Sequence, residues 1–156
     1  MMMRKFCGAL VILLLLALGA MTWFFVIRGS TAQGEDGRTV VLLSPSDRAF
    51  FLAEMRGWLE SVQGITEALA EGDMKRAAEE ARAAGKVDMS QIPGSLLRSI
   101  PVEMKRLGLD THAAFRTLAQ EIEGGKDAKA ALKVLSELML NCVGCHASYR
   151  VEAKRE

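Results

Sequence analysis

Five residues near the C-terminus have the types and spacing needed to bind a redox cofactor: Cys142-Val143-Gly144-Cys145-His146. The C-x-x-C-H pattern is that of c-type haem attachment. Two thiols three positions apart share one face of a helical turn, so each can form a thioether to one vinyl group of the same porphyrin. The adjacent histidine is then the proximal ligand of the iron. We predict one covalent haem c per chain, bound by Cys142, Cys145 and His146.

The pair of thiols has two other interpretations, a redox dithiol and half of a zinc site. A thioredoxin-like dithiol accompanies a βαβ pattern, which this chain does not show. A structural zinc site takes four nitrogen or sulfur ligands, and beyond the N-terminal segment only His112 would complete the set. The adjacency of Cys145 and His146 would strain such a tetrahedral site. Haem is therefore the favoured prediction, with the other two kept open.

The N-terminal segment is apolar enough for a membrane. Phe6 to Ile27 is a run of 22 residues with Thr22 as its one clearly polar member. At about 1.5 Å per residue, a helix of this length spans about 33 Å, which is enough for a bilayer core. We predict that residues 1–28 form a membrane anchor or uncleaved signal segment, with membrane lipid as the partner of residues 6–27.

The flanking residues place the rest of the chain outside the cytoplasm. Arg4 and Lys5 precede the apolar run, and the positive-inside rule keeps them on the cytoplasmic side. We predict attachment to a bacterial inner membrane, with the haem domain in the periplasm. Cleavage near Ala32 is the alternative, because the residues there are small; loss of residues 1–32 would give a secreted periplasmic protein.

Beyond residue 28 we expect a tether over residues 29–43 and a haem domain over residues 44–156. From Gln33 to Glu156 the chain holds 17 Lys and Arg against 19 Asp and Glu, a net charge of −2. This balance, without a basic stripe, argues against nucleic-acid binding. About 120 residues suffice for one domain with a single core.

The haem domain shows helical periodicity punctuated by glycine and proline, and no strand signals. Capping residues and glycine stops mark four main helices, with a short helix before the third. These elements predict an all-α, antiparallel four-helix bundle preceded by an N-terminal transmembrane helix or signal segment. The link over residues 86–109 is a candidate wall of the cofactor site. The expected helices cover 45–71, 74–84, 101–107, 111–123 and 128–151.

Apolar residues at helical spacing identify the expected inward faces. The first helix carries a stripe with alternating steps of four and three, the second an alanine face, and the last two further apolar rows. The residues expected inward are Phe51, Met55, Trp58, Val62, Ile65 and Leu69; Ala77, Ala81 and Ala84; Phe115, Leu118, Ala119 and Ile122; and Ala131, Leu132, Leu135, Leu138, Met139, Cys142, Cys145, His146 and Tyr149.

A four-helix domain with C-x-x-C-H close to its C-terminus, followed by Tyr149-Arg150, resembles the cytochrome c′ family, the class II c-type cytochromes that include the low-spin cytochrome c-556 type. The resemblance covers about residues 44–152. It implies a haem attached outside the cytoplasmic membrane. Any protein ligand for the distal face must come from upstream, because ten residues follow His146 and none is methionine or histidine.

The resemblance also implies roles for residues of the first helix. In this family a basic residue near the haem propionates is followed, four positions later, by the residue that faces the iron. Arg48 and Leu52 match these positions, which gives five-coordinate iron; a shift of three positions instead places Met55 over the iron as sixth ligand. Arg150 is a second candidate for propionate pairing, and Tyr149 is expected to pack against the porphyrin edge.

The identity of the distal residue stays open at this level. Met104 in the short helix and His112 early in the third helix are further candidates, and the remaining alternative is an open site. A methionine in an apolar stripe is also an ordinary core residue. Arg56 shares the candidate propionate role of Arg48, and for both the ordinary interpretation is a solvated helix charge.

Three functions are compatible with such a domain. An electron carrier with redox partner proteins in or near the membrane is favoured. The main alternative is a five-coordinate haem protein that binds NO or CO at a distal face formed by Leu52 and Phe51, and the third is a structural module stabilised by haem. The chain offers no nucleophilic triad, phosphate loop or carboxylate pair, so we predict no enzymatic activity. Dimerisation through the first two helices, frequent in the family, is compatible with Trp58.

Overall fold

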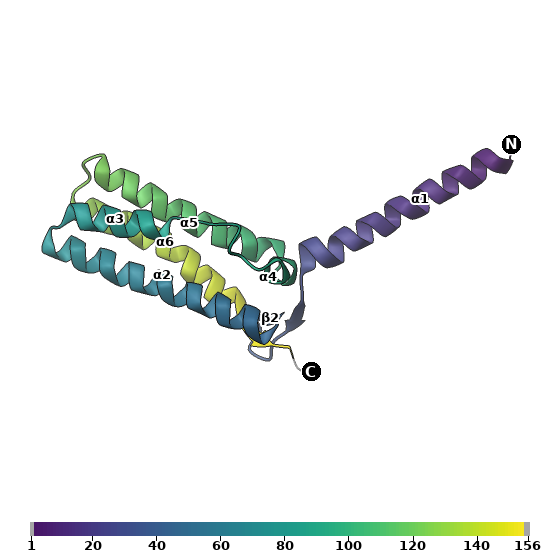
Figure 1. Ribbon diagram of the computed structural model, residues 1–156, viewed down its shortest axis with the longest axis horizontal. Helices are drawn as coiled ribbons and strands as arrows, with labels where there is room; N and C mark the ends of the chain where they lie inside the picture. Colours follow the sequence, from purple (N-terminus) through teal and green to yellow (C-terminus); the bar gives the residue numbers. More distant parts are fainter. Residues whose placement is uncertain (1, 155–156) are drawn as a thin grey trace.

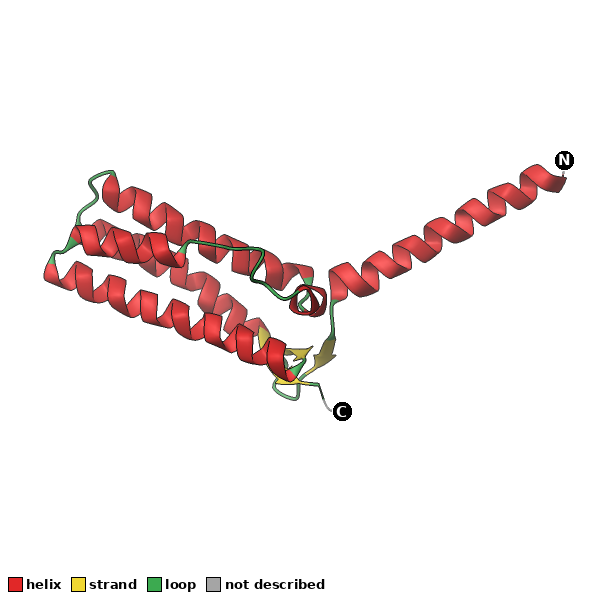
Figure 2. Ribbon diagram, in the orientation of Figure 1, coloured by secondary structure: helices red, strands yellow, loops and turns green. Residues whose placement is uncertain are grey.

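The computed structural model describes residues 2–154, with side chains described except at 2–7, 9, 25 and 26. Residues 1 and 155–156 of the expected anchor and haem domain lie outside this range. The described chain forms six α-helices, one π-helical segment and a three-stranded sheet (Figure 2). In chain order the elements are α1 (Met2–Thr22), η1 (Trp23–Arg28), β1 (Thr31–Gln33), β2 (Thr39–Leu43), α2 (Pro45–Glu71), α3 (Met74–Ala84), α4 (Gly94–Ser99), α5 (Val102–Glu123), α6 (Ala128–Ser148) and β3 (Tyr149–Ala153).

Four helices, α2, α3, α5 and α6, pack side by side, and each runs opposite to the one before it (Figure 1). α3 contacts both α2 and α5, while α6 packs against α5 and α2. The mostly helical fold expected from the sequence is confirmed. The core between them consists of Ile65, Ala68, Leu69, Ala77, Ala78, Ala81, Ala84, Phe115, Leu118, Ala119, Ile122, Ala131, Leu135 and Leu138.

The ends of α2 and the start of α3 follow from capping residues. Ser44 Oγ accepts a hydrogen bond from the Asp47 backbone N–H at 3.1 Å, and Pro45 occupies the first helical position. Gly72 ends α2 in the left-handed conformation, with φ 75°, which costs a glycine little. Asp73 then caps α3 through the Arg76 backbone N–H. These boundaries agree with those expected from the sequence.

Most of the expected inward residues are buried. The alanine face of α3 lies in the core, so that α2 and α5 can both approach this helix closely. Leu132, Met139 and His146 on α6 are exceptions, since all three are exposed, the first two to 43% and 41%. The buried stripe of α6 is therefore narrower than expected and comprises Ala131, Leu135 and Leu138.

The third helix of the bundle is longer than expected. The sequence predicts a short helix that ends at Gly108 and a new one after it, whereas α5 runs unbroken over its full length. A glycine inside a helix costs about 1 kcal/mol relative to alanine, and packing offsets this cost because Met104 and Thr111 on either side are buried. Thr111 Oγ1 donates to the Leu107 carbonyl at 2.7 Å, so it bonds back within the helix instead of capping a new one.

A small sheet is the main departure from the expected all-helical domain. Residues 29–43, predicted as a tether, contain β1 and β2, which pair antiparallel. The last helix ends at Ser148 rather than continuing to residue 151, and β3 pairs parallel with β2. Burial explains β2, since Val40, Val41 and Leu43 are at most 3% exposed and β-branched residues suit a pleated surface.

Helix α1 projects away from the four packed helices (Figure 1). Its side chains from Leu10 to Leu18 are exposed. We expected a transmembrane helix over residues 6–27; among the described residues, however, no helix is both long enough and apolar enough to span a membrane. Gly29 follows η1 at the junction with the helical domain, where a Cβ would collide with the Ser99 carbonyl.

Candidate functional site

A cavity of about 530 Å³ lies between α2, α5 and α6 and is lined mainly by apolar side chains. Its volume falls within the range of small-molecule and cofactor sites. The cavity brings together five of the eight predicted site residues, although they lie far apart in the sequence. These five are Leu52, Met55, Cys142, Cys145 and His146.

The two thiols lie on the α6 wall of this cavity. Cys142 and Cys145 are both free and both half-buried. Burial raises the pKa of each thiol, and the neighbouring Cys142 adds to the effect at Cys145. Dithiol oxidoreductases instead lower the pKa of the attacking cysteine. The surroundings of this pair therefore do not favour a redox dithiol.

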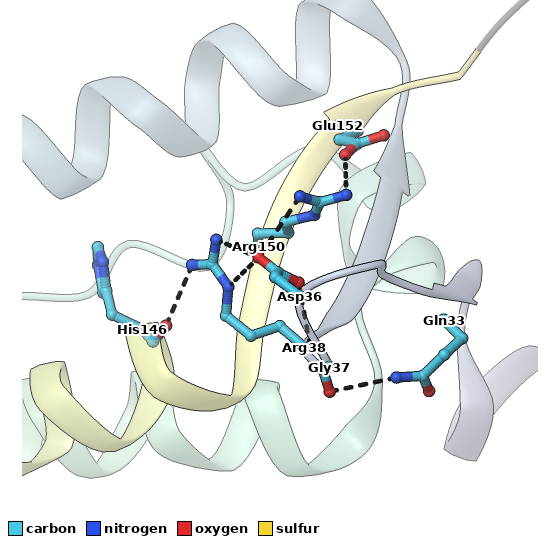
Figure 3. Close-up of polar contacts among 7 residues, drawn as sticks. All are labelled: Gln33, Asp36, Gly37, Arg38, His146, Arg150 and Glu152. Atoms are coloured by element: carbon cyan, nitrogen blue, oxygen red, sulfur yellow. Dashed lines mark hydrogen bonds and ion pairs between the residues drawn. The ribbon is translucent and has the colours of Figure 1, made fainter.

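His146 lies in the last turn of α6, one position after Cys145, and lines the same cavity. Its side chain is exposed. The backbone carbonyl of His146 accepts a hydrogen bond from Arg38 Nη1 at 3.2 Å (Figure 3). Cys142, Cys145 and His146 thus lie near the C-terminal end of α6, and β3 begins directly after this helix, at Tyr149.

Two thioethers line the cavity from the helices that face α6. Met55 is half-buried on α2, one turn after Leu52. Met104 on α5 is buried, with an exposed fraction of 5%. Met139 also lines the cavity from α6, so it is not the core residue that we expected. Either Met55 or Met104 could supply a sulfur ligand from a helix other than the one that carries the cysteines.

His112 is not among the residues that line the cavity. Its Nδ1 is 2.9 Å from the Ala84 carbonyl oxygen, and its ring packs edge-on against Trp58 with the ring centroids 4.8 Å apart. Burial lowers the pKa of His112 and favours the neutral form. The ring is thereby held between α2 and α3, and it is a poor candidate for a ligand of a group bound in the cavity.

The three arginines predicted to contact haem propionates do not all lie at the cavity. Arg56 lines the cavity, whereas Arg48 and Arg150 do not. Arg150 pairs with Asp36 and Glu152 (Figure 3), and its Nε is buried without a hydrogen-bond partner. The pairing of these arginines with propionates stays a prediction.

Tyr149 begins β3 and packs in a second apolar cluster with Cys145, Phe50 and Phe51. Burial raises the pKa of its hydroxyl. The residue is not among those that line the cavity, so its predicted packing against a porphyrin edge stays a prediction.

The donor set fits a flat, apolar, covalently attached cofactor better than a metal ion. Two free thiols and an imidazole border one apolar cavity, and Arg56 is a cation on its lining. Among the described residues, no group of three or more His, Cys, Asp or Glu side chains is arranged to hold a metal ion. His112 is bonded elsewhere and does not complete the zinc set considered from the sequence.

Several lining residues were missed by sequence reasoning. Thr111 reaches the cavity from α5, and Asn141 and Val143 reach it from α6. Leu107 and Gly108 also line the cavity, and they lie within the link over residues 86–109 that we expected as a wall of the cofactor site. The predicted break at Gly108 separated Thr111 from Met104 and Leu107. A continuous helical row of Met104, Leu107 and Thr111, spaced by three and four, was the signal that would have found them.

Comparisons with protein-family models, with curated proteins and with solved structures found no match.

Proposed function

We propose that this protein is a monohaem c-type cytochrome that transfers electrons through a covalently bound haem c. The observation that carries the proposal is the placement of Cys142, Cys145 and His146 together on one wall of an apolar cavity. A C-x-x-C-H motif has the spacing for two thioethers and one axial ligand. Facing methionines supply candidates for the other axial position.

In this proposal the bound haem supplies one-electron chemistry at its iron. Cys142 and Cys145 would hold the cofactor covalently, and His146 would be a ligand of its iron. Met55 is our first candidate for the distal ligand, and Met104 is the second, since both line the cavity. The apolar walls exclude water and so favour the less charged, reduced state.

The arrangement of α2, α3, α5 and α6 is compatible with an antiparallel four-helix bundle of the cytochrome c′ type, and we include that likeness in the proposal. We further propose a periplasmic location, with contact between the N-terminal segment and membrane lipid. The support is the exposed apolar surface of α1, which includes Leu13, Leu15 and Leu16 at more than 60% exposure. We include redox partner proteins in or near the membrane, and a homodimer, in the same proposal.

The alternative is a five-coordinate haem protein that binds NO or CO. Leu52 and Phe51 border the cavity beside Met55. If Leu52 covers the iron, the distal face stays open and apolar. Such a face admits small neutral ligands and excludes anionic ones.

The deciding experiment is the absorption spectrum of the full chain, co-expressed with haem-attachment machinery, in the oxidised, reduced and CO-treated reduced forms. Haem that survives denaturation and extraction is covalently attached. Low-spin bands without a CO response identify an electron carrier with six-coordinate iron. A high-spin spectrum that changes with CO favours the gas-binding alternative. Absence of covalent haem, with intact folding, contradicts both.

Two single variants then assign the distal ligand. We expect Met55→Leu to convert the low-spin spectrum to high-spin and to create a CO response, because leucine fills the same volume without a sulfur donor. Met104→Leu should leave the spectrum low-spin. Met89→Leu is the matched control, since Met89 is 54% exposed and does not line the cavity. The reverse result for the first two variants would assign the ligand to Met104.

A further inference from the structure

The backbone carbonyl of His146 accepts a hydrogen bond from an arginine that lies far away in the sequence, before the four packed helices. Arg38 Nη1 donates to His146 O at 3.2 Å, across a separation of 108 positions. The last carbonyls of a helix lack intrahelical partners, and a cation there also interacts favourably with the helix dipole. The preceding carbonyl, of Cys145, already accepts from the Tyr149 N–H. Arg38 thus completes the end of α6 at the residue predicted to bind iron.

Asp36 holds the Arg38 side chain in place (Figure 3). Its Oδ2 accepts from Arg38 Nε at 2.8 Å and lies 2.7 Å from Arg38 Nη2, while its Oδ1 accepts from the Arg38 backbone N–H at 3.1 Å. The hydrogen bond from the Arg38 side chain lowers the pKa of Asp36 and keeps it ionised. The same carboxylate lies 3.4 Å from Arg150 Nη1. The Asp36 carboxylate therefore contacts both Arg38, which donates to the His146 carbonyl, and Arg150, which follows the motif in β3.

The backbone holds this cluster in register. β2 pairs parallel with β3, so Thr39 lies opposite Tyr149 and Val40 opposite Arg150. The hairpin itself is fixed by the turn at Gly37, whose φ of 83° suits glycine, and by burial of Val41. The β1–β2 hairpin, which precedes the four packed helices, and β3, which follows the motif, thereby form one sheet.

We propose that Arg38, oriented by Asp36, is a positioning residue that fixes the backbone of His146 and so sets the direction of its imidazole toward the cavity. The inference rests on the proposed haem function. Isolated surface ion pairs contribute little stability, and the claim here concerns orientation rather than stability. A side chain on the last turn of a helix can turn with its backbone as that turn frays, and a hydrogen bond to the His146 carbonyl opposes this motion.

The charges of Arg38 and Asp36 would also act on the reduction potential of a haem held by His146. A cation near the axial histidine disfavours the more positive, oxidised haem, and an anion favours it. Loss of the Arg38 charge should therefore lower the reduction potential, whereas loss of the Asp36 charge should raise it. A purely structural defect would not produce shifts of opposite sign.

The test uses the full chain with haem attached, and compares Arg38→Gln, Arg38→Lys and Asp36→Asn with wild type. Hydrogen exchange is measured for the peptide that covers residues 142–150, and the reduction potential is measured on the same samples. For Arg38→Gln we expect exchange in this peptide to rise on the order of tenfold, from the net value of a hydrogen bond to a charged group. Arg38→Lys should recover part of the protection, since it keeps a cation and a donor.

Arg82→Gln is the matched control, because Arg82 also forms an exposed ion pair, with Glu123, but far along the bundle on α3. The proposal is overturned if Arg38→Gln leaves exchange in the 142–150 peptide and the potential at wild-type values. It is also overturned if Arg82→Gln changes both to the same extent. If the wild type incorporates no haem, the proposed function fails; exchange on the haem-free chain then still decides whether Arg38 fixes this segment.

Discussion

The two histidines of the chain differ in their chemistry because their neighbours differ. His146 is exposed at the cavity, and its carbonyl, not its ring, is the atom held by Arg38. The ring of His112 is held by the Ala84 carbonyl and by Trp58. The sequence alone offered both rings as iron ligands, and the contacts of single atoms separate them.

At the same scale we predict a pH dependence of stability that originates in His112. Burial lowers its folded pKa below 6.5, so protonation favours the unfolded chain. The contribution of neutral His112 to the free energy of unfolding is fully present above the pKa of His112 in the unfolded chain. It is lost as the pH falls through about 6.5 toward the lower pKa of the folded state. The hydrogen bond to the Ala84 carbonyl and the charge of nearby Glu54 oppose this lowering of the pKa, whereas the charge of Arg116 reinforces it.

Urea denaturation of the full chain between about pH 7.5 and about pH 5.5 tests this expectation. The free energy of unfolding should fall with pH in the wild type and should fall less in His112→Gln, which keeps a donor for the Ala84 carbonyl. Equal slopes for the two proteins would show that the imidazole of His112 does not titrate in this way.

At the scale of elements, the β1–β2 hairpin is part of the folded domain rather than a tether. Leu43 is fully buried against Leu96, Ile100 and Met104. We expect Leu43→Ala to lower the free energy of unfolding by about 2–5 kcal/mol, because it removes buried methyl groups and leaves a cavity. Leu109→Ala is the control; with Leu109 53% exposed, its effect should stay within about 0.5 kcal/mol. Similar values for the two variants would restore the interpretation of residues 29–43 as a tether.

The strands could not be predicted from the sequence because their burial depends on contacts between distant residues. Thr39–Leu43 is a five-residue strand whose last four residues are apolar, and its burial depends on β3, more than a hundred positions later. The continuity of helix α5 could not be predicted for a related reason: packing on both sides of Gly108 outweighs the local preference of glycine to end a helix. Ser44, Gly72 and Asp73 act on their immediate neighbours, and so they could be interpreted correctly from the sequence.

At the scale of the whole molecule, the four packed helices and the sheet form one unit from which α1 projects (Figure 1). We expect residues 29–156 to fold with the helicity of the four-helix region. Residues 44–156 should be less stable by several kcal/mol, because loss of buried Val40, Val41 and Leu43 removes roughly 1.5–3 kcal/mol each. Circular dichroism during thermal unfolding compares the two chains. Equal midpoints would place the domain boundary at residue 44 after all.

The sequence by itself determined the helical class, most helix ends and the motif Cys142–His146, because caps, apolar periodicity and C-x-x-C-H spacing depend on residues close together along the chain. Only the tertiary structure decided that Met55 and Met104 face the same cavity as the thiols, that His112 does not, and that Arg38 reaches the carbonyl of His146. These relations join residues on different elements. They depend on how side-chain volumes pack and on which polar groups find partners across the fold, and no local pattern in a single sequence records either.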